Sequence, residues 1–357
     1  MYDVICVGGG LAGAAYANLM AQKGLKVMVI EKDTFPRHKV CGEYVSMESY
    51  QFLERLGLKL NSLDLPRISH FTLSNTKGKT FNTELDLGGF GISRFLLDDL
   101  LKQAAIKAGV TWETAQITQI TGELGGFQLL SNDSKYTGKQ VVGAWGKRAG
   151  LDRELKRPFY FDEKSRLTNW LGIKHHIRTD FSPKHIALHT FKNGYCGISK
   201  IENDKYCLCY LMRASNLQGR SIEQAEQDIL AQNPFLKSIF SQSDFLYDKP
   251  LAISQVNFKK KSKVEGHMLM LGDTAGLIAP LSGNGMSIAL RSAFMASENP
   301  TNYEKEWTKE FGSRMQLGRT VQYFFGRPAL MNGFVAFANA FPPIANGLIK
   351  KSHGKPF

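Results

Sequence analysis

The sequence lacks the features that mark several common classes of protein. Its 357 residues contain five cysteines, an odd number, and no CxxC pair, which argues against a disulfide framework or a zinc finger and favours free thiols in a reducing compartment. No apolar run approaches the roughly 20 residues that cross a bilayer, and the first residues lack the basic, apolar and small-residue order of a signal peptide. We therefore expect a cytoplasmic protein that is soluble or bound peripherally to a membrane.

The charge balance and the missing basic motifs bear on the partners of the protein. Lysine and arginine number 45 against 32 aspartates and glutamates, which gives a net charge of +13. This excess favours anionic partners such as a phosphorylated cofactor or an acidic membrane surface, and it is equally typical of a basic surface that keeps a protein soluble. Because there is no basic arm, zinc-finger spacing or aromatic and basic RNA motif, we expect no nucleic-acid partner.

The order of apolar segments predicts two interleaved domains. Residues 2–31 read as a strand, a glycine turn, a helix and a second buried strand, which indicates a parallel sheet with a right-handed crossover. Residues 165–258 contain alternating segments separated by turn residues, which is typical of an antiparallel sheet. The predicted fold class is α/β, or α+β overall, with a Rossmann-like nucleotide-binding domain, an inserted antiparallel β-sheet substrate domain and C-terminal helices. The predicted ranges are 1–65, 92–164 and 259–325 for the first domain, 66–91 and 165–258 for the second, and 326–357 for the helical tail.

A glycine motif follows the first predicted strand. In "VGGGLAGAAYA", Gly8 suits the tight turn, Gly10 lets the backbone approach a pyrophosphate, and Gly13 lets the helix pack closely on the strand. Glu31 ends the next strand, where an acid accepts hydrogen bonds from ribose hydroxyls and disfavours a 2′-phosphate, so the bound nucleotide is predicted to be FAD or NAD rather than NADP. The predicted binding residues of this unit are Gly8, Gly10, Leu11, Ala12, Gly13, Glu31 and Lys32.

A second glycine-rich junction favours FAD over NAD. Residues 272–290, "GDTAGLIAPLSGNGMSIAL", join a predicted strand to a helix that starts near Asn284. The free N–H groups and positive dipole end of that helix suit the negative charge of a reduced flavin ring, while Asp273 suits a ribityl hydroxyl. The predicted binding residues here are Gly272, Asp273, Pro280, Gly283, Asn284, Gly285 and Met286.

The stretch "FPRHKVCGEYVSMES", residues 35–49, predicts a cofactor clamp that ends in a thiol. A metal site is disfavoured because Cys41, His38 and Glu43 have no known ligand spacing. A redox disulfide is disfavoured because Ser46 stands five residues after Cys41, where disulfide reductases have their second cysteine. Arg37 and Lys39 are predicted to supply positive charge beside a pyrophosphate. Arg37, Cys41 and Gly42 therefore join the predicted cofactor-binding residues.

The first motif with Glu31, the GD motif with its following PxxGxG, and "SRFLLDDLL" at 93–101 resemble the FAD-dependent oxidoreductases that share the p-hydroxybenzoate hydroxylase fold. Within them, "CGE" at 41–43 and "GDTAG" are most similar to the geranylgeranyl-reductase branch. The resemblance implies that Arg94 binds the cofactor and that Cys41 faces the isoalloxazine, where it donates a proton, shapes the pocket or is simply a small buried thiol. Two departures are that Trp145 replaces the aspartate of an Asp-Gly pair, and that neither the tunnel motif of prenyl reductases nor the WxWxIP motif of halogenases is present.

The resemblance implies an enzyme that uses FAD and takes its electrons from NAD(P)H, which docks transiently because the chain has a single GxGxxG. The predicted substrate is a hydrophobic small molecule, either aromatic, polyketide or lipid-like. The favoured reaction is hydroxylation through a flavin C4a-hydroperoxide, with reduction of a C=C bond, or a flavin-binding, membrane-associated protein without turnover, as alternatives. In either enzyme the protein supplies positioning and a dry pocket.

Several residues of the middle and C-terminal regions are weaker candidates. Tyr195 is a candidate catalytic residue on the substrate side. The histidines at 175, 176, 185 and 189 lie on predicted strands without matching ligand spacing, so we predict no metal, although one of them is a candidate acid or base facing the flavin. The apolar tail at 328–349, broken by Pro342 and Pro343, is predicted to pack on the protein, with a peripheral membrane contact as the alternative.

Overall fold

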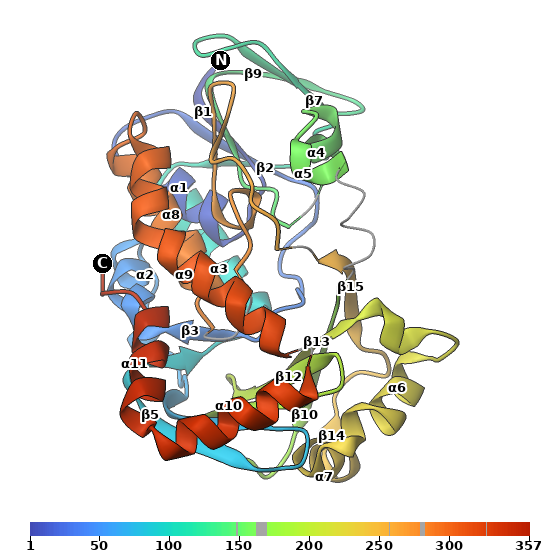
Figure 1. Ribbon diagram of the computed structural model, residues 1–357. Helices are drawn as coiled ribbons and strands as arrows, with labels where there is room; N and C mark the ends of the chain where they lie inside the picture. Colours follow the sequence, from blue (N-terminus) through green and yellow to red (C-terminus); the bar gives the residue numbers. More distant parts are fainter. Residues whose placement is uncertain (148, 162–169, 257, 279–282, 326) are drawn as a thin grey trace.

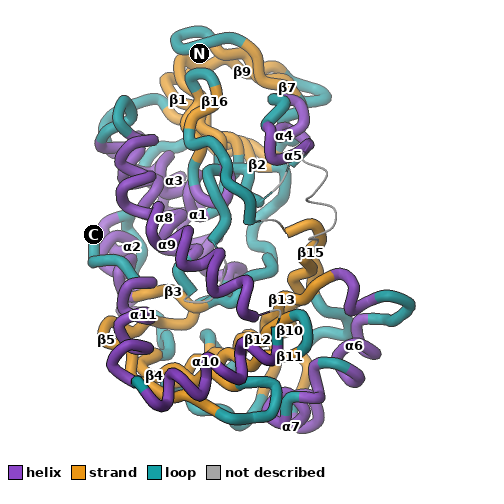
Figure 2. Tube along the Cα trace, viewed as in Figure 1, coloured by secondary structure: helices purple, strands orange, loops and turns teal. Residues whose placement is uncertain are grey.

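The computed structural model describes residues 1–147, 149–161, 170–256, 258–278, 283–325 and 327–357. Two sheets organise these residues, and Figure 2 shows their strands as two separate groups. The predicted fold class, a mixed α/β protein with a nucleotide-binding unit and C-terminal helices, is confirmed.

The first sheet contains the expected parallel strands. Its order is β16–β17–β9–β1–β2–β6, with β7 and β8 attached to β9. The four central pairings, from β17 to β6, are parallel. Because its strands carry helices on the sheet faces, β2 is buried at all five residues. The bounds are β1 Tyr2–Val7, β2 Val27–Glu31, β6 Thr111–Thr114, β7 Gln119–Thr121, β8 Phe127–Leu130, β9 Lys135–Gly143, β16 Val264–Glu265 and β17 Met268–Met270.

Three helices complete this unit, and each follows a predicted signal. Helix α1 (Leu11–Gln22) starts at the glycine motif, α3 (Arg94–Lys107) starts after Ser93, whose hydroxyl accepts from Leu96 N, and α8 (Gly285–Glu298) starts after Asn284. The predicted starts of all three helices are confirmed. Figure 1 shows α1, α3 and α8 close together beside the first sheet, so the glycine motif and the 272–286 junction lie in one region.

The second sheet has the order β14–β10–β13–β12–β11–β4–β5–β3, with β15 also paired to β10. Its hairpins are antiparallel, but β11 pairs with β4 in parallel, which differs from the expected antiparallel sheet. No tight turn joins β4 to β11, because the first unit lies between them in the chain, so nothing forces an antiparallel pairing. The bounds are β3 Tyr44–Ser46, β4 Arg67–Ser74, β5 Thr80–Gly91, β10 Trp170–Arg178, β11 His185–Phe191, β12 Gly194–Lys200, β13 Tyr206–Arg213, β14 Asp244–Phe245 and β15 Leu251–Val256.

Shorter helices border the two units. Figure 1 shows α4 and α5 beside the first sheet, and α6 and α7 at the lower right, beside the second sheet. The bounds are α2 Tyr50–Arg55, α4 Gly150–Glu154, α5 Pro158–Phe161, α6 Ile222–Asp228 and α7 Pro234–Gln242.

Three C-terminal helices follow: α9 (Tyr303–Phe325), α10 (Pro328–Ala340) and α11 (Pro342–Ser352). The first part of α9 packs in the core of the first unit and its end reaches the second sheet, while α10 and α11 lie against the second sheet. Helix α10 ends before Pro342, as predicted, because proline cannot continue the helical hydrogen bonds. The helices bury Met331, Val335 and Ala338 against the sheet. The tail therefore packs on the protein, as predicted. Four apolar side chains of α10 and its connection to α11 are exposed: Leu330, Phe337, Phe341 and Ile344. Among the described helices, none combines the length and the hydropathy needed to cross a bilayer.

Candidate functional site

The glycine turn before α1 leaves no room for side chains at two of its glycines. Gly8 has φ +104°, a left-handed conformation that favours glycine, and a side chain there would overlap the backbone of Ala144. A side chain on Gly13 would overlap the carbonyl oxygen of Gly8. Gly10 caps the helix, and no side chain among the described residues accepts from the first N–H groups of α1. These N–H groups therefore suit an anion such as a pyrophosphate.

Two cations lie at the mouth of this turn. A side chain on Gly10 would come within 3.3 Å of Lys39 Nζ and 3.8 Å of an Arg94 guanidinium nitrogen. Both cations meet Asp98: Arg94 makes two hydrogen bonds to it, at 2.7 and 2.8 Å, and Lys39 Nζ lies 3.5 Å from it. Burial lowers the pKa of Lys39 to about 8, although Asp98 opposes this. An anion bound at Gly10 would hold Lys39 in its charged form, so the turn, Lys39 and Arg94 fit a pyrophosphate.

Glu31 lies at the other end of the same turn. One carboxylate oxygen accepts from Gly9 N at 2.8 Å, and the other accepts from Arg37 at 2.9 Å. Arg37 also pairs with Asp33. The two acids draw the Arg37 guanidinium to them, so Arg37 lies beside Glu31, where the ribose is expected. Lys32 is exposed, and Lys39 is the lysine that lies beside Gly10.

The second glycine-rich junction packs directly on the first. Gly272 has φ +56°, and a side chain there would press on Ala12 of α1 and on α8, while its N–H donates to Ser292. Asp273 lies in a short 3-10 helix, Gly272–Thr274, and is half-buried. Leu11 and Met286 are buried where α1 and α8 approach. The predicted residue Pro280 lies outside the described residues, and Asn284 and Gly285 form the start of α8.

Gly283 has to be a glycine because the ring of Tyr44, which no sequence motif indicates, lies against it. It has φ +66°, and a side chain there would overlap the ring of Tyr44, whose Cε1 would lie 2.8 Å away. On the other side of that ring, a side chain on Gly89 of β5 would lie 2.6 Å from the Tyr44 hydroxyl. The ring of Tyr44, on β3 of the second sheet, therefore fills the space between Gly89 of β5 and the turn that ends at Gly283, called here the 283 turn.

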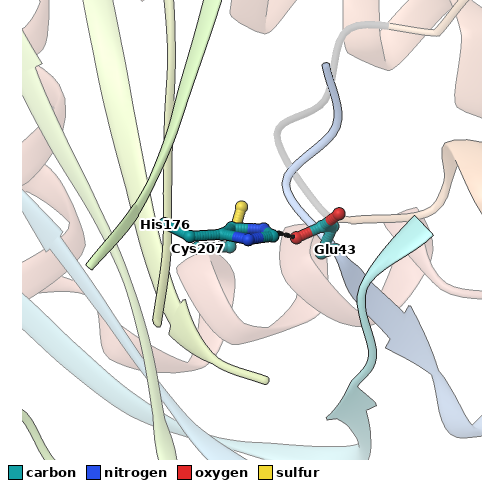
Figure 3. A group of neighbouring side chains, drawn as sticks. All are labelled: Glu43, His176 and Cys207. Carbon is teal, nitrogen blue, oxygen red and sulfur yellow. Dashed lines mark hydrogen bonds and ion pairs between the residues drawn. The ribbon is translucent and has the colours of Figure 1, made fainter. Parts of the chain in front are cut away.

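The Cys41 loop is held by a buried network that joins the second sheet to helix α3 of the first unit (Figure 3). Glu43, which has φ +55°, accepts hydrogen bonds at one oxygen from Lys174 Nζ at 2.6 Å and from Arg94 N at 2.8 Å. Its other oxygen pairs with His176 Nε2 at 2.6 Å. The thiol of Cys207 donates to the carbonyl oxygen of Cys41 at 3.2 Å. Strands β10 and β13 thereby fix the loop next to Arg94.

The electrostatics of this network keep Glu43 charged. Burial alone would raise the pKa of the Glu43 carboxyl, but the hydrogen bond from His176 and the charge of Lys174 outweigh burial, so its pKa lies below the usual value. Burial likewise opposes the charge of Lys174, yet Glu43 raises the pKa of Lys174 overall. Burial raises the pKa of the Cys207 thiol well above its usual value, so this thiol stays protonated.

Glu43, His176 and Cys207 also have the chemistry of metal ligands, and their ligand atoms lie within 4.8 Å of one another. No sequence spacing indicates these partners of His176, because they come from separate elements of the chain. Lys174 already neutralises the same carboxylate at 2.6 Å. A metal ion would share with Lys174 a single carboxylate charge that the ammonium already neutralises, so we interpret the cluster as an ion-pair network.

The other histidines and Tyr195 lie away from the Cys41 loop. His175 pairs with Glu226 at 2.8 Å, His189 with Ser74 at 2.9 Å, and His185 with Ser182. Tyr195 is buried on β12 and packs edge-on against Phe325 of α9. All five cysteines are free, as predicted.

An apolar pocket lies between the second sheet and the C-terminal helices. It holds about 980 Å³ of empty space, counting its open mouth. Phe81 and Leu188 line it from the sheet, and Phe325 and Phe334 line it from α9 and α10. Ile278 and Tyr44 also line the pocket, and Tyr44 lies against Gly283. One wall of the pocket therefore lies beside the second glycine-rich junction, where the flavin ring is predicted to bind. Tyr195 lies behind Phe325 and does not line the pocket.

The fold and the two glycine junctions define a nucleotide-binding flavoprotein, and comparisons with known proteins agree. Residues 1–299 match the model of the FAD binding domain family, and the chain belongs to that family. The family includes monooxygenases and halogenases, so the chain is an FAD-dependent flavoprotein of that group. The turn at Gly8–Gly13 with Lys39 and Arg94 fits the FAD pyrophosphate.

Among curated relatives, the conditioned medium factor receptor 1 of Dictyostelium discoideum is 23% identical over 367 residues, which cover 92% of this chain and 71% of the relative. The menaquinone reductase of Mycobacterium tuberculosis is 24% identical over 368 residues, covering 96% and 86%. The flavin-dependent halogenase armH3 of Armillaria mellea is 30% identical over 353 residues, covering 83% and 66%.

Among solved structures, the flavin-dependent brominase Bmp2 superposes with a TM-score of 0.78 at 18% identity, covering 98% of this chain and 93% of the other. The halogenase PltM, solved with phloroglucinol and FAD, gives a TM-score of 0.74 at 16% identity, covering 98% and 82%. At these identities the likeness supports the fold alone.

Proposed function

We propose that the protein is an FAD-dependent monooxygenase that acts on a hydrophobic small molecule held in the apolar pocket, with NAD(P)H as a transient reductant. The observation that carries the proposal is the position of the pocket, which Ile278 and Tyr44 connect to the 283 turn. Bound FAD supplies two-electron chemistry that amino-acid side chains lack. A pocket of this apolar character selects a hydrophobic molecule and excludes water from the reacting atoms.

The chain's own residues have separate tasks in this proposal. Lys39, Arg94 and the N-terminus of α1 bind the pyrophosphate, and Glu31 binds the adenosine ribose. The Glu43 network keeps the Cys41 loop in place from the second sheet. Cys41 is half-buried and is not among the residues that line the apolar pocket, so its role as a proton donor beside the flavin rests on the family resemblance.

Two alternatives have support of their own. Reduction of a C=C bond is supported by the "CGE" motif, which is similar to the geranylgeranyl-reductase branch, and by menaquinone reductases that match 96% of the chain. A flavin-binding protein without turnover is supported by the relative that is named a receptor. Halogenation has relatives in the family, but the WxWxIP motif expected of it is missing from the sequence.

Mass spectrometry of the product distinguishes these reactions. The FAD-loaded protein would be incubated with NADH or NADPH and with a lipid extract of the expression host, in air and without oxygen. We expect a product that gains one oxygen atom, formed only in air. A product that gains two hydrogen atoms without oxygen would establish the reductase instead. Bound flavin that neither nucleotide can reduce would contradict both enzymes.

Replacing the Cys41 thiol tests its role. We expect Cys41→Ala to retain FAD and to lower turnover per bound flavin by about tenfold or more, since general acid catalysis contributes roughly 10²–10⁴-fold. Flavin absorbance measures the retained cofactor, and NAD(P)H consumption measures turnover. Cys196→Ala, at a buried thiol on β12, is the matched control and should change neither quantity. Loss of flavin with unchanged turnover per flavin would assign Cys41 a structural role.

A further inference from the structure

A second cleft lies between the segment that precedes β16 and the start of α9. It holds about 1400 Å³ of empty space, counting its open mouth, and it shares no lining residue with the apolar pocket. Among the described residues that line it are one acid, Glu304, and four lysines: Lys260, Lys261, Lys263 and Lys305. We call this site the lysine cleft. Because its lysines outnumber its acids by three, we expect its ligand to be an anion.

Two of the four lysines are buried in the wall of the cleft. Lys261 is 3% exposed, and its ammonium donates to the backbone carbonyls of Lys147 and Asp273 at 2.7 and 2.8 Å. Lys263 is 5% exposed, and its ammonium donates to the carbonyl oxygen of Lys261 and lies 4.3 Å from the centre of the Trp307 ring. Carbonyl dipoles and a ring face stabilise a positive charge without neutralising it. Neither ammonium forms an ion pair within the described residues, so both charges remain for a ligand to neutralise.

The positive charge of the cleft is largely present at neutral pH. Burial lowers the pKa of Lys261 and of Lys263 to about 8, so most of each side chain remains charged at pH 7. Lys260 and Lys305 are exposed, and in the part of the chain that the structure describes neither has an ion-pair partner. A cleft lined mainly by charges of one sign concentrates ions of the opposite sign.

Two acids near the buried lysines pair with another cation. Arg157 donates to Asp152 at 2.9 Å and to Glu265 at 2.8 Å. Arg157 is fully buried, so this pairing is shielded from water. These carboxylates therefore do not serve as ion-pair partners for the ammonium groups of the lysine cleft.

The uncharged part of the lining suits a phosphate group. Thr301, Asn302 and Thr308 contribute hydroxyl and amide groups. Helix α9, which is 23 residues long, begins at this wall with Tyr303, so the positive end of its dipole adds to the charge of the lysines. A phosphate monoester has three terminal oxygens and nearly two negative charges, so it accepts hydrogen bonds from several such donors at once.

One lysine connects the cleft to the predicted flavin site. Lys261 lines the cleft, and its ammonium donates to the Asp273 carbonyl in the second glycine-rich junction. Lys260 pairs with Gly276 of the same junction through an isolated β-bridge. A phosphate bound in the cleft would thus lie beside the segment that is predicted to hold the ribityl chain. This position suits a nucleotide whose other end must reach the flavin.

We infer that the lysine cleft is a phosphate-binding site and that the phosphate it receives is the 2′-phosphate of NADPH. The choice of NADPH names the reductant of the proposed function and rests on that function, whereas the phosphate site does not. NADH carries the same nicotinamide but lacks the 2′-phosphate, so the protein should prefer NADPH. Free phosphate or another phosphate ester is the other source of the same chemistry.

Isothermal titration calorimetry with inorganic phosphate tests the cleft on the FAD-loaded protein, in which FAD fills the glycine turn before α1. We expect Lys260→Gln with Lys305→Gln to raise the Kd of phosphate at least about tenfold, the factor contributed by one hydrogen bond to a charged group. Both side chains are exposed, so this double variant should fold normally. Lys309→Gln with Lys355→Gln removes the same charge from exposed positions outside the cleft and is the matched control. Phosphate that does not bind, or that both double variants weaken equally, would overturn the site.

Flavin reduction without oxygen identifies the source of the phosphate. The dependence of the reduction rate on nucleotide concentration gives a Kd for NADPH and for NADH. We expect NADPH to bind about tenfold more tightly, and the Lys260 and Lys305 double variant to remove this preference and leave the Kd of NADH unchanged. Equal Kd values for the two nucleotides would overturn NADPH and assign the cleft to free phosphate or another phosphate ester. Flavin that neither nucleotide reduces would contradict the proposed function, while the phosphate titration would still decide the site.

Discussion

Gly13→Ala is expected to abolish FAD binding and to lower the free energy of unfolding by at least about 1–3 kcal/mol, the usual cost of inserting a methyl group into a closely packed site. The new methyl group would overlap the Gly8 carbonyl oxygen and approach Ala144, so α1 must move away from β1. That movement displaces the N–H groups that face the pyrophosphate. Flavin absorbance after purification and urea denaturation of the apoprotein measure the two effects.

Gly333→Ala is the matched control for this substitution. Gly333 lies within α10, and a side chain there would meet open space. Because alanine is a better helix former than glycine by about 1 kcal/mol, this variant should bind FAD normally and be slightly more stable. If Gly13→Ala retained FAD, the close packing of α1 on the Gly8 turn could not be the basis of the site.

Lys174→Met is expected to destabilise the protein by about 3–5 kcal/mol, the cost of leaving a buried charge without its partner. Lys174 is 1% exposed, and its ammonium is 2.6 Å from Glu43. His176 and Arg94 N alone would then have to compensate the Glu43 carboxylate. Urea denaturation measures the loss. Lys200→Met removes a similar ion pair to the exposed Asp204 and should have little effect.

The double variant Lys174→Met with Glu43→Gln tests whether the unpaired carboxylate causes the loss. It should recover much of the lost stability because no buried carboxylate remains.

The ion pair also predicts that the stability of the protein depends on pH. The folded pKa of Glu43 lies below its usual value of 4.5, so its contribution is present above that pH and is lost as pH falls through the folded pKa. Glu43→Gln should therefore flatten the stability curve below about pH 4.5. An unchanged curve would exclude Glu43 as a source of acid sensitivity.

The cofactor turn could be predicted from sequence because every requirement in it is local. Gly8, Gly10 and Gly13 act within one strand, one turn and one helix, and the spacing itself specifies them. Asp98 could have been found as well, since it stands four residues after Arg94 on one helix face. The pairing of Arg37 with Glu31 and Asp33 could not be predicted, because charge alone does not reveal which of two nearby cations an acid will attract.

Contacts between the Cys41 loop and the second sheet could not be predicted. Glu43 and His176 are separated by 133 residues, and only the register of β10 shows that Lys174 and His176 face the Cys41 loop. Tyr44 was missed for a similar reason. Gly89 and Gly283 lie on different elements, and both leave room for the Tyr44 ring. That shared reason for two glycines is visible only in the folded structure.

The order of strands in the first sheet has a consequence for synthesis on the ribosome. Strand β17 completes the sheet by pairing with β9, about 125 residues earlier in the chain, and α8 then packs against α1. The N-terminal motif thus emerges long before the segments that close the cofactor site around it. Pairings so distant in sequence form late, because a long loop must close first. We expect the nascent chain to capture FAD only after residue 298 has left the exit tunnel, so the inserted sheet is made while the cofactor site is still open.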